Sequence, residues 1–126
     1  MYQKKMKEDI RCPLEYGLEI FGGKWNSRII CVLAELGTMR YGEIRDEMVN
    51  ITDTALASTL KVLMKNGLVD RRSYDEIPPR VEYSLTDKGR SAVPILQSIC
   101  KWSGLYHNDC SEFTLKQCQK CNYNGS

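Results

Sequence analysis

The sequence predicts a mainly α-helical domain with a small β-hairpin. Apolar residues recur at helical spacing up to about residue 65 and again from about residue 87, whereas between residues 68 and 85 they alternate with polar ones. A chain of 126 residues suffices for one domain with a modest core. Its 27% charged and 42% hydrophobic residues are ordinary for a soluble globular protein.

Two helices are expected in the first part of the chain. Residues 12–13 (Cys-Pro) open the first, because the N–H that proline lacks would be unpaired at the first helical position, and the glycines at 22–23 end it. The second helix covers residues 25–36, and its broad apolar face predicts that it is largely buried. A short strand is expected at residues 39–41.

The middle of the chain predicts a helix-turn-helix. A short helix over residues 42–48 is followed by a turn at 50–52 and an amphipathic helix over 53–65. Thr52 suits the N-cap of this helix, since its hydroxyl can accept from the free amides of the first turn. The apolar positions of the helix form a single stripe made of Leu56, Leu60, Leu63 and Met64.

A hairpin and a long helix complete the domain. Strands are predicted at residues 68–74 and 80–85, joined by a turn at 75–79 that contains two prolines. The last helix begins after Thr86 and reaches about Tyr106. A hairpin directly after the second helix of a helix-turn-helix is a wing, so the fold class is a winged helix-turn-helix domain, mainly α with a small β-wing, with flanking dimerisation helices.

Charge and hydropathy set the expected domain limits and location. We expect a basic N-terminal arm over residues 1–11, the winged domain with its dimerisation helix over 12–107, and a cysteine-containing tail over 108–126. The net charge of +2 does not by itself indicate a partner, because nucleic-acid binding needs a local basic patch. The chain shows neither a signal peptide nor a membrane-spanning run, so we expect a cytoplasmic protein without membrane association.

The chain resembles the HxlR-type winged helix-turn-helix regulators of the MarR-like group. The resemblance covers about residues 12–106, and its most specific segments are Gly-Gly-Lys-Trp at 22–25 and Pro-Pro-Arg-Val-Glu-Tyr at 78–83. It implies a homodimeric transcription factor that binds dyad-symmetric operators in double-stranded DNA. Some family members sense oxidants, aldehydes or quinones through the cysteine that matches Cys12. Thr59 is a departure, because the family often has arginine there.

A set of small polar and basic side chains is expected to contact DNA. Small residues let a helix enter the major groove, where threonine and serine can bind base edges, and lysine and arginine suit phosphates. The alternatives are a solvated helix face and, for Arg80 in the wing, an ion pair with a wing carboxylate. The predicted DNA-binding residues are Thr52, Thr54, Ser58, Thr59, Lys61, Arg40 and Arg80.

The last helix carries more apolar surface than one side of a domain can cover. This indicates either a second subunit or burial between two parts of the same chain, and we expect the dimer because a small domain has little else to cover the helix. Pro94 removes one backbone hydrogen bond and should bend the helix. The predicted dimerisation residues are Ile95, Leu96, Ile99, Trp102 and Tyr106.

The six cysteines suggest different roles. Cys12 is expected at a helix N-terminus, where free amides and nearby basic residues favour a reactive thiolate, although a small capping residue is the alternative. Cys31 is expected in the core and Cys100 in the core or an interface. In the tail, His107, Cys110, Cys118 and Cys121 offer the ligands of a zinc site, with free thiols or disulfides as alternatives.

The residues argue against an enzyme. The chain has a single histidine, no glycine-rich phosphate loop and no Ser/His/Asp set. No cofactor is therefore required, with zinc in the tail as the exception that the sequence leaves open. The expected function is a DNA-binding regulator that responds to an oxidant or small electrophile through Cys12. The alternatives are a winged-helix module for protein interaction and a metal-responsive regulator that uses the tail cysteines.

Overall fold

The computed structural model of the protein describes residues 12–106. The predicted basic arm and the cysteine tail lie outside these residues. Within them the element order confirms the predicted fold class, mainly α with a small antiparallel sheet. The elements are α1 (Pro13–Phe21), α2 (Asn26–Leu36), β1 (Met39–Arg40), α3 (Tyr41–Met48), α4 (Asp53–Lys65), β2 (Val69–Tyr74), β3 (Arg80–Leu85) and α5 (Asp87–Gly104).

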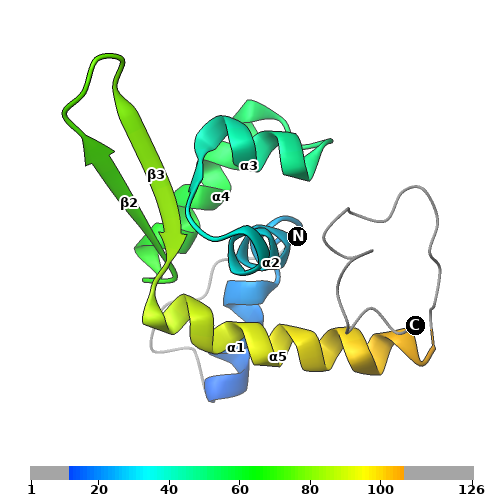
Figure 1. Cartoon of the computed structure of the whole chain (residues 1–126). Helices are drawn as coiled ribbons and strands as arrows, with labels where there is room; N and C mark the ends of the chain where they lie inside the picture. Colours follow the sequence, from blue (N-terminus) through cyan, green and yellow to red (C-terminus); the bar gives the residue numbers. More distant parts are fainter. Residues whose placement is uncertain (1–11, 107–126) are drawn as a thin grey trace.

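The hairpin of β2 and β3 projects from the helical body as a wing (Figure 1). The strands pair antiparallel with Val69 opposite Leu85, and β1 joins the other edge of β3 with Met39 opposite Tyr83, so the order is β1-β3-β2. Only the base of the hairpin contributes buried residues, because Val69 and Leu85 lie there while the turn is exposed. The wing is therefore anchored at one end and free at the other.

Helix α2 lies at the centre of the core, between the helix-turn-helix above and α5 below in the view of Figure 1. Its Ile29, Ile30 and Val32 are fully buried, which explains the broad apolar face in the sequence. The inward stripe of α4 packs in the same core through Leu56, Leu60 and Leu63. Burying an aliphatic side chain of this size contributes about 1.5–3 kcal/mol relative to leaving it exposed.

Side-chain caps set the start of α4 and α5. Thr52 Oγ1 accepts a hydrogen bond from Ala55 N over 3.1 Å, and Thr86 Oγ1 accepts one from Gly89 N over 3.0 Å. Replacing such a cap by alanine typically costs about 1 kcal/mol. Gly67, after α4, has a φ of 75°, a left-handed conformation that favours glycine. These local signals explain why the predicted limits of α4 agree with the structure.

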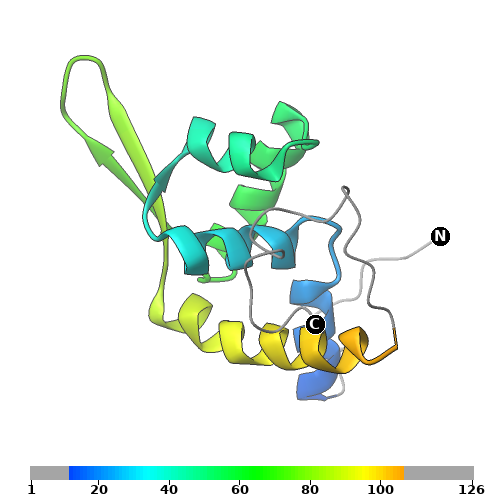
Figure 2. The ribbon, with the colours of Figure 1, turned by 45° about the vertical axis from the view of Figure 1, so that its right-hand side comes forward.

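The remaining boundaries differ from the prediction by a residue or two. Trp25 is the N-cap of α2 rather than its first residue, and Tyr41 begins α3 instead of ending the short strand. The last helix ends at Gly104, and it continues through Pro94 as one helix (Figure 2). In residues 12–106, every helix is too short or too polar to cross a membrane.

Candidate nucleic-acid interface

Helix α4 separates into a buried face and a polar face. Thr54, Ser58 and Lys61 are exposed, as the sequence predicted, while the leucine stripe on the other side of the helix is buried. Ser58 Oγ donates to the carbonyl of Ala55 over 3.2 Å, which leaves the hydroxyl oxygen able to accept from a ligand. Thr52, also exposed, uses its hydroxyl as the N-cap. The helix thus presents small polar groups followed by a lysine.

The outward position expected for Thr59 is wrong. Its exposed fraction is 8%, so the side chain lies in the protein interior and cannot reach a base edge. The sequence contained the signal, because Thr59 follows Leu56 by three residues and precedes Leu63 by four, which places it on the apolar side of the helix. The prediction placed Thr59 on the exposed face because of its polar hydroxyl, whereas its spacing from the leucines indicates the buried face.

Two side chains of α3 hold the start of α4, and the sequence analysis did not identify either of them. Arg45 Nη1 lies 3.0 Å from Asp53 Oδ1, and Tyr41 Oη donates to the backbone carbonyl of Asp53 over 3.0 Å. Burial and the nearby Asp53 carboxylate raise the pKa of Tyr41, so its hydroxyl keeps the donated proton. The hydrogen bond that Arg45 donates to the Asp53 carboxylate raises the pKa of Arg45. Together these contacts fix the angle between the two helices.

Arg80 is surrounded by its own wing. Its Nη2 lies 2.8 Å from Glu76 Oε2, its Nη1 lies 3.7 Å from Glu82 Oε2, and its guanidinium is 3.8 Å from the ring centroid of Tyr74. The ion pair that the sequence left open as an alternative is therefore present. A phosphate contact by Arg80 stays a prediction, and it would require the guanidinium to exchange partners.

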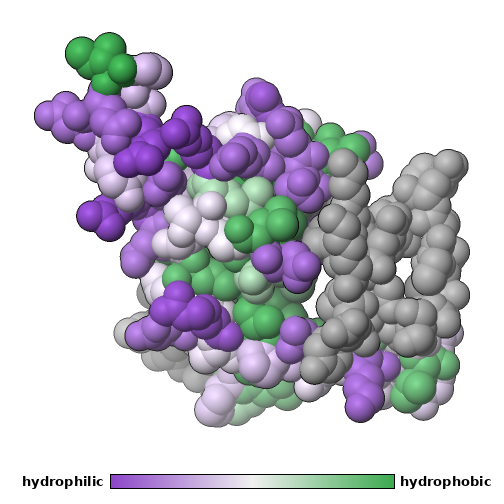
Figure 3. Space-filling view, viewed as in Figure 1, coloured by the Kyte–Doolittle hydropathy of each residue, from purple (hydrophilic) through white to green (hydrophobic). Residues whose placement is uncertain are grey.

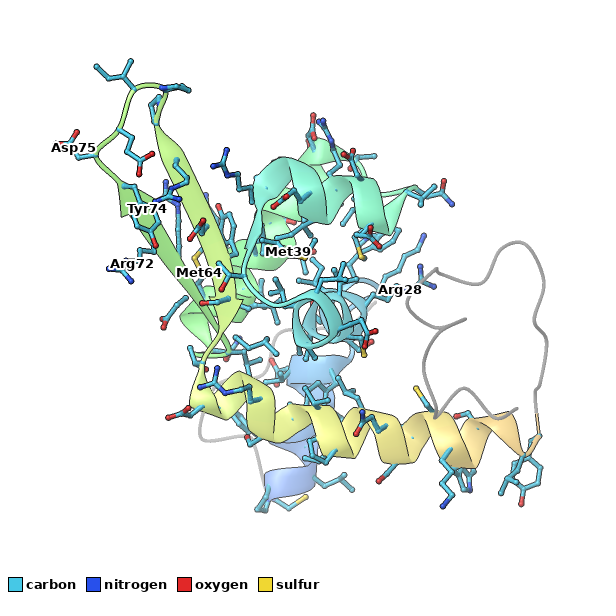
Figure 4. The ribbon with its side chains drawn as sticks, in the orientation of Figure 1. Arg28, Met39, Met64, Arg72, Tyr74 and Asp75 are labelled. Atoms are coloured by element: carbon cyan, nitrogen blue, oxygen red, sulfur yellow. The ribbon has the colours of Figure 1, made fainter. Side chains whose placement is uncertain are left out.

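The outer face of the sheet carries further arginines. Glu82 lies opposite Arg72 on β2 and opposite Arg40 on β1, so these three residues share one face. Arg72 lies 5.2 Å from the ring of Tyr74, and Figure 4 shows both on the wing. Arg40 and Arg72 are exposed, as a phosphate contact requires. The two edge strands, β1 and β2, thus each contribute one exposed arginine to this face of the sheet.

Exposed apolar side chains gather on α1 and α5. Trp102 is 66% exposed and its ring centroid lies 5.7 Å from that of Tyr106, which is 78% exposed. Figure 3 shows apolar residues at the C-terminal end of α5. Isolated exposed apolar residues are common, whereas several on one helix favour an interaction surface. The exposed large hydrophobic residues of α1, of α5 and of the two positions after α5 are Leu14, Tyr16, Leu18, Ile95, Ile99, Trp102, Leu105 and Tyr106.

The burial of Leu96 contradicts its predicted place on a dimer surface. Leu96 is 5% exposed and belongs to the core of its own protomer, so it cannot meet a partner. Leu14 and Leu18 of α1, which were not among the predicted dimerisation residues, are both exposed. Apolar residues at helical spacing indicate that one face of the helix is buried, but the spacing does not show whether the same chain or a second chain buries it.

Cys12 occupies the predicted position at a helix N-terminus. It is exposed and is the N-cap of α1, its carbonyl accepts from Glu15 N over 3.1 Å, and its side chain makes no capping hydrogen bond. Cys31 is half-buried against the core, as expected, and Cys100 is half-buried on α5. The exposed thiol of Cys12 thus belongs to the residue that begins α1.

His107, Cys110, Cys118 and Cys121 lie outside the described residues. Residues 12–106 contain no group of His, Cys, Asp or Glu side chains arranged to hold a metal ion. Zinc binding by the tail remains a prediction from spacing.

A helix-turn-helix with an exposed polar second helix, followed by a partly basic wing, defines a winged helix-turn-helix transcriptional regulator that binds DNA. The chain belongs to the HxlR-like helix-turn-helix family, whose sequence model matches residues 20–111. This confirms the resemblance found in the sequence. Its relatives are transcriptional regulators and not enzymes, as predicted.

Individual relatives cover most of the chain. An uncharacterized HTH-type transcriptional regulator of Methanothermobacter thermautotrophicus is 41% identical over 99 residues, which are 79% of this chain and 75% of the relative. The reduced form of the regulator YodB from Bacillus subtilis matches with a TM-score of 0.70 and 34% identity, over 77% of this chain and 95% of YodB. The redox regulator HypR in its oxidized form has a TM-score of 0.69 and 35% identity, over 76% and 98% of the two chains.

Proposed function

We propose that the protein is a homodimeric regulator that places α4 in the major groove of a dyad-symmetric operator and responds to oxidants or electrophiles through Cys12. The observation that carries the proposal is the division of α4 into a buried leucine face and an exposed face of small polar residues. Folding of the domain does not require small polar residues on the exposed face of α4, beside the wing. In a winged domain it is the surface that meets base edges.

The exposed side chains of α4 suit the recognition of DNA base edges by small, uncharged groups. Thr54 and Ser58 are short enough to let the backbone approach the groove floor. The Thr54 hydroxyl can donate to or accept from a base, and the Ser58 hydroxyl, which donates to Ala55 O, can accept from one. Lys61 lies further along the exposed face and suits a phosphate, as does Arg40 at the edge of the sheet. Because this face carries little charge, affinity depends on a second half-site and hence on a dimer.

The exposed apolar groups of α1 and α5 support a second copy as the partner. A single protomer leaves Trp102, Leu105 and Tyr106 more than 60% exposed, which costs solubility unless they are covered. Two copies related by a two-fold axis would cover them with one another, since a two-fold interface joins the same patch on both subunits. The same axis would present two α4 helices to a palindromic operator.

Cys12 supports an oxidant response. Its thiol is exposed at the N-cap of α1 and makes no capping hydrogen bond, so the sulfur is accessible to an oxidant or electrophile. With hydrogen peroxide, the sulfur forms an S–O bond, the O–O bond breaks and water leaves, so the thiol becomes a sulfenic acid and the peroxide is reduced. The structural neighbour HypR is described as a redox regulator, in an oxidized and a reduced form.

The experiment titrates the protein into a duplex from the upstream region of its own gene, with fluorescence anisotropy and sedimentation as readouts. We expect two protomers per duplex, salt-dependent affinity, and weaker binding after mild treatment with hydrogen peroxide. In Cys12→Ser the peroxide should have no effect. Binding of one protomer would exclude the dimer, and equal peroxide responses in both proteins would remove Cys12 from the mechanism.

A further inference from the structure

The ammonium group of Lys88 joins three segments that are far apart in the sequence. Its Nζ donates to the hydroxyl of Tyr16 in α1 and to the backbone carbonyl of Asn66 at the end of α4, each over 2.8 Å. The ammonium also lies 5.3 Å from the ring centroid of Tyr16. Lys88 itself stands in the first turn of α5. One side chain thus connects α1 and α5 to the helix proposed to read DNA.

The start of α5 is fixed against the turn that ends α4. Thr86 Oγ1 donates to the carbonyl of Gly67 over 2.6 Å, and Thr86 N donates to the carbonyl of Leu68 over 3.0 Å. A Cβ added to Gly89 would lie 2.2 Å from Leu68 O, so the backbones already approach as closely as glycine permits. Because this junction cannot slide without breaking these contacts, Lys88 and the end of α4 move together.

Helix α1 is attached differently at its two ends. Near its C-terminal end Ile20 is buried, and Asn26 Nδ2 donates to the carbonyl of Ile20 over 2.6 Å. Leu14 at its start and Leu18 past its middle are exposed, so burial within the protomer contributes little at these positions. Figures 1 and 2 show α1 reaching from beside α5 up to α2. The bond from Lys88 to Tyr16 therefore helps to set the position of the first half of α1.

Cys12 lies one helical turn before Tyr16. The carbonyl of Cys12 accepts from Tyr16 N over 3.5 Å, so both residues belong to the same first turn. A group attached to the exposed sulfur adds volume and polarity at this N-cap, where the free amides of the helix lie. A change of this kind would displace the turn that carries Tyr16, and the Tyr16 hydroxyl would move away from Lys88.

We propose that Lys88 is a positioning residue that transmits the state of α1 to the C-terminal end of α4. Modification of Cys12 shifts Tyr16, Lys88 loses one of its two acceptors, and the junction of α5 with the end of α4 is no longer held to α1. The operator-bound orientation of α4 then becomes less populated. This inference rests on the proposed response of Cys12, and it adds the route by which that response reaches DNA.

The test compares the wild type with Tyr16→Phe, which removes only the hydroxyl and leaves the Lys88 bond to Asn66. Both proteins are treated with N-ethylmaleimide, whose C=C bond takes up the Cys12 sulfur at one carbon and the thiol proton at the other. The readouts are affinity for the upstream duplex and hydrogen exchange of amides 62–68. Cys12→Ser, treated in parallel, corrects for the other cysteines.

In the wild type we expect modification to lower DNA affinity by about 5-fold or more, a typical size for coupling between sites, and to speed exchange at amides 62–68. In Tyr16→Phe we expect both effects of modification to be largely lost, and unmodified Lys88→Met should also show fast exchange there. Lys101→Met removes an exposed ammonium from the other end of α5 and should behave as wild type.

Equal loss of affinity in wild type and Tyr16→Phe would overturn the Lys88 route while leaving the response of Cys12 intact. If modification leaves the DNA affinity of the wild type unchanged, the proposed response of Cys12 fails. In that case the exchange data decide about Lys88. The route is supported if modification speeds exchange at amides 62–68 in the wild type and causes no further change in Tyr16→Phe, and any other exchange pattern overturns it.

Discussion

Arg45 of α3 and Asp53 of α4 form an ion pair in which Nη1 lies 3.0 Å from Oδ1. The pair joins the two helices of the helix-turn-helix at the end where α4 begins. Asp53 stands in the first turn of α4, where its charge stabilises the helix dipole but would repel a phosphate. Arg45 offsets that charge, so the pair allows an acidic residue at the start of the helix that we propose reads DNA.

We therefore predict that Arg45→Met weakens binding to operator and scrambled duplexes alike, while Asp53→Asn has a smaller effect. The Met variant leaves an unpaired carboxylate beside the phosphates, and the Asn variant does not. A double-mutant cycle on DNA affinity measures the coupling between the two residues. Additive effects of the two substitutions would show that the pair does not contribute to binding.

Ser58→Ala should change sequence preference. Loss of a hydroxyl that reads a base edge costs up to about 1–3 kcal/mol of discrimination at that base pair, with little effect on binding to scrambled DNA. The matched control is Thr59→Val, which removes a hydroxyl from the same helix at a buried position and should leave sequence preference unchanged. The base-reading role of Ser58 is wrong if its operator and scrambled-DNA affinities fall together.

Lys61 and Arg80 should differ in their contribution to salt dependence. Lys61→Ala is expected to lower the slope of log affinity against log salt by about one unit, the effect of one lost phosphate contact. Arg80→Ala should lower it by less, because the Arg80 guanidinium is already paired with Glu76 and Glu82. A full unit lost on substitution of Arg80 would mean that it exchanges its wing partners for a phosphate.

Two neighbouring positions of α5 separate dimerisation from folding. Ile99 is 49% exposed and Leu96 is 5% exposed, so Ile99→Glu should give a folded protein with a monomer mass, whereas Leu96→Ala should lose about 2–5 kcal/mol of stability. Sedimentation and thermal unfolding of the two variants provide the measurements. A dimer mass for Ile99→Glu at micromolar concentration would place the interface elsewhere.

Two glycines should respond oppositely to alanine. At Gly89 a Cβ would meet Leu68 O at 2.2 Å, so Gly89→Ala must separate α5 from the end of α4 and should destabilise the fold severely. At Gly17, within α1, a Cβ meets nothing within 4 Å, and Gly17→Ala should stabilise by about 0.5–1 kcal/mol. Chemical denaturation compares them, and a tolerated alanine at 89 would show that the junction is loose.

Local signals made much of the fold predictable. Thr52 and the Asn66-Gly67 pair delimit α4, and the change of period after Leu68 marks the wing, because caps and periodicity act within a few residues. Thr59 and Leu96 show the limit of such signals. Their burial depends on neighbours from other elements, and a residue at the margin of an apolar stripe can lie on either side of it.

The parts of the candidate DNA interface that lie on a single helix could be predicted from the sequence. The exposed face of α4 follows from its own sequence, whereas the contact of Arg45 with Asp53 and that of Lys88 with Tyr16 join residues 8 and 72 positions apart. Nothing in the spacing of such residues indicates that they meet. Tertiary packing brings them together, and only the structure identifies them.

The central claim is that two copies of α4 read a palindromic site. Hydroxyl-radical footprinting on the upstream region of the gene tests it most directly. The account predicts protection of two half-sites whose centres lie about 34–36 Å apart, or a multiple of this, around a dyad. The protection should be altered by Ser58→Ala and lost in Ile99→Glu. A single unpaired protected segment that Ile99→Glu retains would contradict the account.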